Sequence, residues 1–501
     1  MASAAQLDTL EAKGLIELAA SRPELEYLFR HWLVQDAAYE SLLKQERRQL
    51  HRLVGEALEA LYPDRRSELA GVLAMHFEQV GDSEKALEYL TAAGRFALER
   101  NAITEAYSAF DRAAKLLLPT AEAEEERLLR RRIEIELGRH KAGWTFRPID
   151  DVIADLEAIL PVAERLGELD LIAPLHLGLA LARLQRGDPS SDPVVKHSLD
   201  RVAEIGEILQ DHSLRALPLA LIGLTQVFTG PIRDGVMALE QAVPLLEQRQ
   251  DFIGAAFARG ALAIGYANLG EFDKAEMASR NATELAASGD LIAQLDAQIA
   301  QSWLRAARGQ LDEAVPLALA CVARAEETGA TACVVASSWV LGDAYHRQGR
   351  FDEASRAFQR GQEIALVVDR KVWRPTLQAW LGSTSAALGE VAASEGDWED
   401  SLTTARSIGN RYGEAGILWK RAEATARRGE AAAALPDFAA SSAILEELGA
   451  RPDLARVLRG WGETLRAAGR PAEGEEALRR ALALFEAMGI DAEAEAVRAA
   501  L

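Results

Sequence analysis

One short motif recurs through most of this chain at a nearly constant spacing, and that spacing constrains the fold more than any other feature. "GEFDKA" begins at residue 270, "GQLDEA" at 309 and "GRFDEA" at 349, and related segments begin at 389, 429 and 469. The period is therefore about 40 residues. Periods of this size are typical of arrays in which every unit is one small supersecondary element that stacks on the next.

Two further features keep the same spacing. A small residue stands seven positions before each motif glycine, namely Ala263, Ser302, Gly342, Gly382, Ala422 and Gly462. A second series of glycines lies about midway between the motifs, at Gly289, Gly329, Gly409, Gly449 and Gly489, with Asp369 at the one position where the series lacks a glycine. Because three independent features share one spacing, chance is a poor explanation, and the repeat is the strongest signal in the sequence.

The segment from 335 to 369 indicates what one unit looks like. Leu341 and Tyr345 precede the motif glycine, and Ala354 and Phe358 follow it, each pair four residues apart and therefore on one face of a helix. Gly349 stands between the two helices, where a left-handed residue can end a helix at little steric cost. The segment therefore predicts two antiparallel helices whose apolar faces meet.

This pattern resembles the tetratricopeptide repeat, with a period longer than the usual 34 residues. The resemblance implies an all-α, right-handed superhelical solenoid with a concave inner surface, and the abundance of strong helix formers agrees with it. The segments 73–94 and 101–117 read as earlier repeats, and Gly187 and Gly230 as further turns, with Gly167 and Gly206 as ends of second helices. We expect about ten helix pairs between residues 68 and 501.

The first seventy residues follow a different pattern. "GLIEL" and "LEYLF" flank the polar segment "AASRPE" and predict a β-hairpin. A single helix fits before it, around residues 4 to 13. After it, Leu53, Val54, Leu58 and Leu61 trace an apolar stripe on a helix that Pro63 ends.

The segment 27–59 resembles the linker between the ATPase and the repeats of bacterial multidomain signalling ATPases, including adenylate-cyclase-like proteins and regulators similar to the maltose-regulon activator. The matching elements are Phe29, Arg30, His31, the run "QDAAYESLL", Arg47 and His51, whereas Trp32 stands where the family has a small residue. The resemblance implies a truncated winged-helix module over 1–66. First tetratricopeptide-like helices are then expected over 67–120, and the 40-residue repeats over 121–501.

Charge and composition exclude several classes of partner. The formal net charge is −21 and the isoelectric point is near 5, whereas binding to nucleic acid or to an anionic membrane needs a concentrated basic surface. The helix around residues 4 to 13 offers Asp8, Glu11 and Lys13, which also argues against reading DNA. We find no secretion signal and expect no membrane span. With only two cysteines, Cys321 and Cys333, a reducing cytoplasmic location is expected.

Motifs for catalysis and for cofactors are missing from the sequence. There is no "GxxxxGK[ST]" phosphate loop, no "HExxH" or "CxxC" metal pattern and no "GxSxG" nucleophile motif. No pair of carboxylates stands against an apolar wall as acid–base catalysis requires. We therefore expect a protein that is not an enzyme and that holds neither a metal nor another cofactor.

Tryptophans recur on the first helices of the repeats and are the best candidates for a binding site. Trp339 and Trp419 occupy equivalent positions, and Trp303 and Trp380 lie close to that position in their own repeats. Charged residues flank them. The candidate groove residues are Trp303, Trp339, Asp343, His346, Arg347, Trp380, Trp419, Lys420, Glu423 and Arg427. Two interpretations stay open: the tryptophans either seal one repeat against the next, or form an aromatic ledge of the kind used at binding hot spots.

The sequence therefore predicts a non-catalytic binding scaffold, the sensor portion of a signalling ATPase or cyclase-type regulator. Its partner would be a protein or peptide segment or a small effector, held in the groove. Binding would change the superhelix pitch or promote self-association. The alternative is a freestanding cytoplasmic adaptor that assembles protein complexes. An in-frame phosphate loop encoded upstream of Met1 would favour the sensor, and a promoter directly upstream would favour the adaptor.

Overall fold

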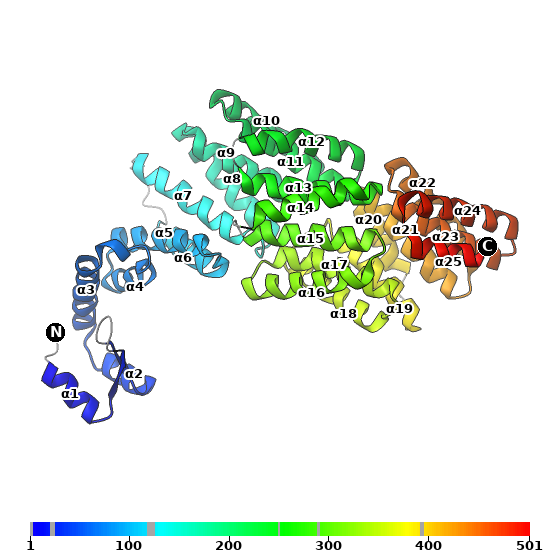
Figure 1. Cartoon of the computed structure of the whole chain (residues 1–501). Coiled ribbons are helices and arrows are strands. Elements are labelled where there is room, and N and C mark those ends of the chain that lie inside the picture. The colour runs from blue at the N-terminus through cyan, green and yellow to red at the C-terminus, as the bar shows by residue number, and fades with distance from the viewer. Residues whose placement is uncertain (1–3, 21–25, 118–125, 249–250, 288–290, 391–394) are drawn as a thin grey trace. The chain divides into compact units, whose positions relative to one another are not determined.

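The computed structural model describes residues 4–20, 26–117, 126–248, 251–287, 291–390 and 395–501. These residues form 25 α-helices, one short 3-10 helix and a single two-stranded sheet, so the all-α class is confirmed (Figure 1). The chain divides into two compact units, the first comprising 1–97 and 108–120 and the second 98–107 and 121–501. The domain boundary at residue 66 stays a prediction.

The predicted hairpin is present in the first unit. Its strands pair antiparallel with Ile16 opposite Phe29, while the turn at 21–25 lies outside the described residues. The elements up to residue 116 are α1 (Ala4–Ala12), β1 (Ile16–Ala20), β2 (Glu26–Phe29), α2 (Trp32–Glu40), α3 (Lys44–Leu61), the 3-10 helix η1 (Pro63–Arg65), α4 (Ala70–Val80), α5 (Ser83–Glu99) and α6 (Ile103–Leu116). The helix expected around residues 4 to 13 is α1. The winged-helix assignment itself stays a prediction.

The apolar stripe predicted on α3 lies on a helix but is largely solvent-exposed. Leu53, Val54 and Leu61 are all exposed, and Trp32 on α2 is exposed to 70%. This first unit therefore presents apolar side chains that nothing within it covers. Single exposed apolar residues are ordinary, but several on one small unit are typical of a surface that meets another protein.

The second unit consists of helices throughout its described residues. They are α7 (Glu126–Gly143), α8 (Ile149–Leu166), α9 (Leu169–Arg186), α10 (Pro193–Ile208), α11 (His212–Thr229), α12 (Ile232–Gln248), α13 (Phe252–Leu269), α14 (Phe272–Ala286), α15 (Leu291–Ala307), α16 (Leu311–Thr328), α17 (Thr331–Arg347), α18 (Phe351–Val367), α19 (Arg374–Leu388), α20 (Glu395–Ser407), α21 (Arg411–Arg427), α22 (Ala431–Leu448), α23 (Arg451–Ala467), α24 (Pro471–Met488) and α25 (Asp491–Ala500). Consecutive helices pack in antiparallel pairs that repeat as a tetratricopeptide-type solenoid (Figure 1).

The residues that end the helices of the repeats have a left-handed backbone conformation. Gly349 has a φ of 74° immediately after α17, and every other motif glycine from Gly270 to Gly469 is also left-handed. Asp369 has a φ of 47°, so it replaces the missing glycine in conformation as well as in position. The prediction for Gly206 was wrong, because α10 continues to Ile208 and the left-handed residue is Gln210, at a φ of 53°.

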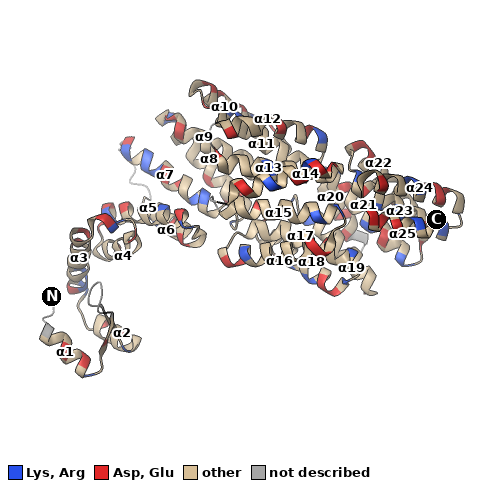
Figure 2. Ribbon diagram, viewed as in Figure 1, with Lys and Arg blue, Asp and Glu red and all other residues tan. Residues whose placement is uncertain are grey.

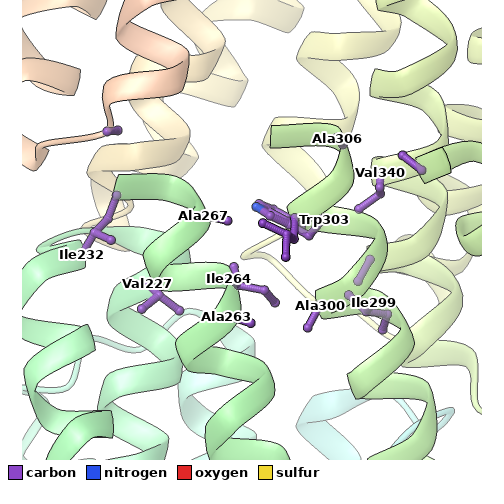
Figure 3. Packing of buried hydrophobic residues seen from close by; sticks show 14 of the residues in the cluster. Val227, Ile232, Ala263, Ile264, Ala267, Ile299, Ala300, Trp303, Ala306 and Val340 are labelled. Atoms are coloured by element: carbon purple, nitrogen blue, oxygen red, sulfur yellow. The ribbon is translucent and has the colours of Figure 1, made fainter. Parts of the chain in front are cut away.

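Small residues allow the two helices of a pair to approach closely, as the pattern predicts. A Cβ atom added to Gly342 would lie 2.4 Å from Cε1 of Phe358. Phe358 is fully buried, and Leu341, Tyr345 and Ala354 lie buried around it. The buried apolar residues of successive helices pack in the same way across α11, α12, α13, α15 and α17 (Figure 3).

One helix corrects the expectation that no segment is long and apolar enough to cross a membrane. Within the described residues, α13 meets that test by length and composition. Most of its residues are buried against the neighbouring helices, among them Tyr266, Ala267 and Leu269. A helix that is covered on all sides is apolar all round, and this accounts for its composition.

The solenoid winds tightly enough that residues far apart in sequence touch. Helix α11 contacts α21, and α13 contacts α23. Arginines tie these turns together by donating to main-chain carbonyls: Arg451 Nε lies 2.7 Å from the oxygen of Leu269, and Arg456 Nη2 lies 2.7 Å from that of Ala307. These contacts between turns line the inner side of this unit, and the ligand-binding groove that the repeat pattern implied stays a prediction.

Charge is distributed over the helices in both signs, as Figure 2 shows, with a basic run on α7 at Arg130, Arg131 and Arg132. Arg130 within that run pairs with Glu134 and Glu168, so part of its charge is neutralised. Both cysteines are free and buried, and burial raises the pKa of the Cys321 thiol to about 11, as befits a structural cysteine.

Candidate functional site

The four candidate tryptophans lie side by side along the inner helices α15, α17, α19 and α21. Trp303 stacks on Trp339 with ring centroids 4.5 Å apart, and Trp339 lies 5.6 Å from Trp380. Trp380 then meets Trp419 edge to face at 6.2 Å. The structure therefore brings together residues that span 116 positions of sequence (419 − 303) into one aromatic row.

The row lies inside the solenoid and offers little surface to a partner. The exposed fractions of Trp303, Trp380 and Trp419 are 5%, 5% and 6%, and only Trp339 is partly exposed. Tyr412 on α21 and Asp453 on α23 line a cavity of about 40 Å³ together with the row. Of the two interpretations left open by the sequence, sealing of one repeat against the next fits this burial, whereas the binding ledge stays a prediction.

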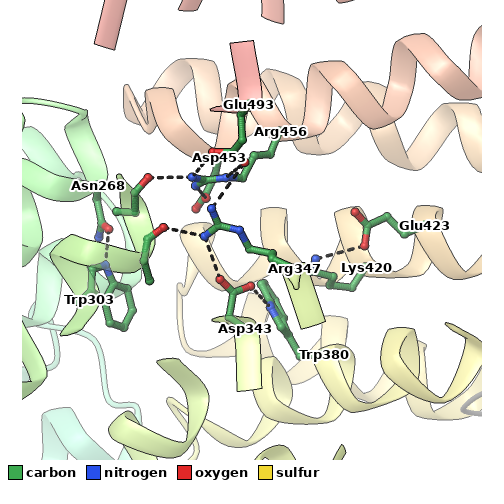
Figure 4. A network of polar contacts seen from close by, with 12 residues as sticks. Asn268, Trp303, Asp343, Arg347, Trp380, Lys420, Glu423, Asp453, Arg456 and Glu493 are labelled. Atoms are coloured by element: carbon green, nitrogen blue, oxygen red, sulfur yellow. Dashed lines mark hydrogen bonds and ion pairs between the residues drawn. The ribbon is translucent and has the colours of Figure 1, made fainter. Parts of the chain in front are cut away.

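Asp343 and Arg347 belong to a buried polar network beside the aromatic row (Figure 4). The Oδ1 atom of Asp343 accepts from the indole of Trp380 at 3.0 Å, and its Oδ2 atom lies 3.4 Å from Nη1 of Arg347. Burial alone would raise the pKa of Asp343, but the nearby cations Arg347 and Lys420 outweigh it, and the pKa is lowered. Asp343 is therefore an anion that accepts a hydrogen bond from the Trp380 indole and pairs with Arg347.

The same network reaches the last helix of the chain. Glu493 on α25 lies 2.9 and 3.0 Å from two guanidinium nitrogens of Arg456, and 3.5 Å from Nη2 of Arg347. Arg347 in turn donates to the carbonyl of Ala306 at 2.7 Å. Sequence reasoning missed Arg456 and Glu493, since they lie in repeats far from the tryptophan row along the chain.

The remaining candidates surround Lys420, whose side chain is almost completely buried. Its ammonium lies 3.8 Å from the centroid of Trp419 and 3.1 Å from Oε2 of Glu423. Arg427 donates to the carbonyl of Ser383 at 3.3 Å, and His346 shares a hydrogen bond of 2.9 Å with Thr384. Nine of the ten candidates are therefore buried or half-buried, whereas Arg427 is exposed.

His346 predicts a measurable pH dependence of stability. Burial, followed by the charge of Lys420, lowers its pKa to about 4 from the ordinary 6.5. As the pH falls from 6.5 toward 4, the unfolded chain binds this proton and the folded chain does not. Across that range, this group should make the free energy of unfolding of the wild type fall with falling pH by about 1.4 kcal/mol per pH unit. In His346→Gln this contribution to the slope should be absent. His31→Gln, on the surface of the first unit, is the control, and an unchanged slope in His346→Gln would contradict the assignment.

A much larger cavity, of about 450 Å³, lies next to the aromatic row in the second unit. It shares Phe228 and Trp373 with the small cavity, so the two are neighbours. Its walls are mostly apolar and come from α9, α11, α13, α15 and α17, together with the segment between α18 and α19. Volumes between about 300 and 1,000 Å³ are usual for small-molecule sites, so this cavity is the better candidate for ligand binding.

Sequence reasoning did not identify the residues of this cavity. Its polar wall includes Arg370, Thr145 and Gln185, which come from three separate repeats. The one available signal was the irregular repeat at Asp369, where the expected glycine is missing and Arg370 follows.

Ser198, His176 and Glu164 form a hydrogen-bonded chain with the residue types of a hydrolase triad. The Ser198 hydroxyl lies 3.2 Å from Nδ1 of His176, whose Nε2 atom lies 3.2 Å from Glu164. Ser198 is only 1% exposed and lies in the middle of α10, where the amides around it bond within the helix. Without free donors for an oxyanion, this arrangement does not fit acyl transfer. Across the described residues, no group of three or more His, Cys, Asp or Glu side chains could hold a metal.

Comparisons with known proteins agree with this fold. Models of the tetratricopeptide repeat match residues 336–366 and 413–487. An uncharacterized protein, R02095 of Rhizobium meliloti (strain 1021), is 32% identical over 114 residues, which are 22% of this chain and 11% of that protein. The chain therefore aligns with about a tenth of the length of this relative.

Two solved structures are similar to this chain, and the first of them supports the solenoid architecture. A Rap protein complexed with Competence and Sporulation Factor matches at a TM-score of 0.53 and 14% identity, over 71% of this chain and 98% of its own. A signal transduction ATPase with numerous domains and a tetratricopeptide repeat sensor, from Pyrococcus horikoshii, matches at 0.40 and 13% identity, over 91% of this chain and 75% of its own. The second unit is thus a tetratricopeptide-type solenoid.

Proposed function

We propose that this chain is a non-catalytic sensor module that binds a protein segment or a small effector inside its superhelix. The observation that carries the proposal is the apolar cavity of about 450 Å³ enclosed by the inner helices of successive repeats. A cavity of this size within a rigid scaffold suits holding a ligand, and the chain of contacts at Ser198 offers no comparable basis for catalysis. The Rap protein, whose structure contains Competence and Sporulation Factor, supports a bound factor as the occupant of such a fold.

The contacts between superhelical turns provide the element that a ligand would bias. Arg451 and Arg456 donate to carbonyls of an earlier turn, and Arg370 does the same across 226 residues. A ligand that binds the closed or the opened solenoid with different affinity shifts the balance between them. The change in superhelix pitch, or a self-association that follows from it, would be the output of the sensor.

The first unit would pass this output to a partner. Its exposed apolar residues, including Trp32, Leu43 and Leu53, are suited to packing against another protein surface. The sequence resemblance suggests that this surface belongs to the ATPase module of a signalling ATPase or cyclase-type regulator. The same exposed residues also fit the alternative of a freestanding adaptor, and a phosphate loop encoded upstream distinguishes the two.

A peptide selection tests whether the cavity is the binding site. The full chain is panned against a random-peptide library in parallel with Ala336→Trp, which places an indole in the cavity wall, and with Ala432→Trp, an exposed position on α22. We expect peptides that are enriched on the wild type and on Ala432→Trp but lost on Ala336→Trp. Enrichment that is equal on all three proteins would contradict binding in the cavity.

A further inference from the structure

Arg370 is the most unusual residue in the wall of the large cavity. It lies between α18 and α19, is exposed to only 1%, and lines the cavity with its side chain. Within the described residues, no carboxylate forms an ion pair with it. The other deeply buried arginines of the solenoid are paired, since Arg347 and Arg456 both meet Glu493.

The guanidinium of Arg370 uses only part of its donor capacity. Nη1 donates to Oε1 of Gln185 at 2.9 Å, and Nη2 donates to the carbonyl of Trp144 at 2.5 Å. Its Nε atom is buried and has no partner. Because a guanidinium carries five N–H donors, several remain for an acceptor that the protein does not supply.

Burial of the Arg370 guanidinium carries an electrostatic cost. Burial lowers the pKa of Arg370 to about 10, and no nearby carboxylate offsets the shift. The group therefore stays charged at neutral pH, where a buried charge without a counter-ion is costly unless another partner compensates it. An anion in the cavity would remove this cost.

A second polar atom in the same wall also lacks a partner. The hydroxyl of Thr145 is buried and makes no hydrogen bond, although its carbonyl accepts from Thr331. Thr145 follows Trp144, the residue whose carbonyl Arg370 reaches, so the two unsatisfied groups lie in one region of the wall. Buried polar atoms are rarely left unsatisfied, and two of them in one cavity wall point to a missing acceptor.

The rest of the wall is suited to an apolar group. Leu217, Leu221, Leu224, Phe257 and Ile264 are among the side chains that line it. Two acidic residues also line the cavity, but Asp251 caps α13 by accepting from the amide of Gly254, and Asp296 on α15 forms no ion pair with Arg370. Lys141 and Ile253, both exposed, mark where the cavity reaches the surface.

We propose that the cavity binds an amphipathic monocarboxylate, with its carboxylate on the guanidinium of Arg370 and its apolar part along the leucines of α11. The proposal rests on the proposed function and names the chemistry of the ligand. Arginine suits this role because its planar fork can bind both oxygens of one carboxylate. The carboxylate could come from a free aliphatic acid or from the C-terminus of an apolar peptide.

Three ten-carbon probes test the charge preference on the full chain. Decanoate, 1-decanol and decylamine share one apolar chain and differ in head group, and their binding is followed by calorimetry and by the fluorescence of Trp144 and Trp373 in the cavity wall. Since hydrogen bonds to charged groups contribute about 1.5–3 kcal/mol, decanoate should bind about ten- to a hundredfold more tightly than 1-decanol. Decylamine should bind most weakly.

Arg370→Gln should abolish the preference for decanoate and leave binding of 1-decanol unchanged. Arg451→Gln is the matched control, because it also removes an arginine bonded to a carbonyl of an earlier turn but lies outside the cavity. It should keep the preference. Equal affinity of the wild type for decanoate and 1-decanol would overturn the proposal without any variant, and so would a preference that survives Arg370→Gln.

Apolar peptides with free and amidated C-termini distinguish the two sources of the carboxylate. If the protein prefers the peptide with the free C-terminus and this preference depends on Arg370, the ligand is a peptide. If decanoate binds but the peptides show no such preference, the ligand is a small acid. If ligands occupy the cavity with no preference for an anion, the carboxylate proposal fails and the sensor function survives. If neither the ten-carbon probes nor any selected peptide binds, both fail.

Discussion

Glu493→Ala is expected to lower the free energy of unfolding by about 3–5 kcal/mol, because it leaves two buried arginines without their shared carboxylate. Glu493 contacts Arg456 at 2.9 Å and Arg347 at 3.5 Å, and both arginines are largely buried. Burial and the charge of Arg456 already lower the pKa of Arg347. Without the carboxylate, the two cations would repel each other with little solvent to screen them.

Chemical denaturation and hydrogen exchange together measure this effect. Because long repeat arrays do not always unfold in two states, exchange of the amides of α17 and α23 reports whether the loss reaches the helices that carry the arginines. Glu475→Ala is the control, since its pair with Arg479 is exposed and such pairs contribute about 0–1 kcal/mol. A cost for Glu493→Ala no larger than that of the control would mean that the network adds nothing.

The same carboxylate gives a pH signature. Burial opposes its ionisation, but Arg456 and Arg347 outweigh that effect and lower the pKa of Glu493 to about 2 from 4.5. The folded-state pKa is depressed, so the stabilisation is complete above pH 4.5 and disappears as the pH falls toward 2. Glu493→Ala should therefore lose less stability than the wild type between pH 4.5 and 2.

Trp303→Ala is expected to cost about 3–5 kcal/mol, through the cavity it leaves and through the hydrogen bond it removes. The indole of Trp303 stacks on Trp339, meets Phe228 at 5.4 Å and donates to Oδ1 of Asn268 at 2.8 Å. Asn268 is buried and would lose the partner of its oxygen. Trp303→Phe should cost less, since it keeps an aromatic ring in the row.

Thermal and chemical unfolding measure this change, with Trp32→Ala as the control because that side chain is 70% exposed. The same measurements on Trp339→Ala and Trp419→Ala, combined with partner capture, decide between the two interpretations of the row. A large loss of stability identifies core packing. Loss of partner capture with nearly unchanged stability would instead identify a binding ledge. The sealing interpretation of the buried tryptophans would then be wrong.

The repeats could be predicted because each one depends on residues that lie close together in sequence. Gly342 packs against Phe358 on the next helix of the same pair. The left-handed residue at position 349 or 369 ends a helix within its own unit. The hairpin is equally local. Each of these features leaves a pattern that a single sequence displays, because the interacting residues lie at fixed offsets.

The interior could not be predicted, because its geometry depends on the small rotation of each repeat relative to the last, summed over several repeats. Nothing at Arg370 indicates that Trp144 lies beside it, and nothing at Trp303 indicates that Tyr412 faces the same small cavity. The sequence therefore placed the tryptophans on the inner helices but could not say that the next turn covers them. Arg370 passed unnoticed for the same reason.

The acceptors in the ties between turns are main-chain oxygens, at Trp144, Leu269 and Ala307. A main-chain oxygen is present whatever side chain the residue carries, so mutation at the acceptor position leaves the tie intact. The residue that supplies the accepting carbonyl can therefore change during evolution while the arginine is retained. The two positions then have no reason to change together. A search for co-varying positions would pass over the very bonds that close this solenoid.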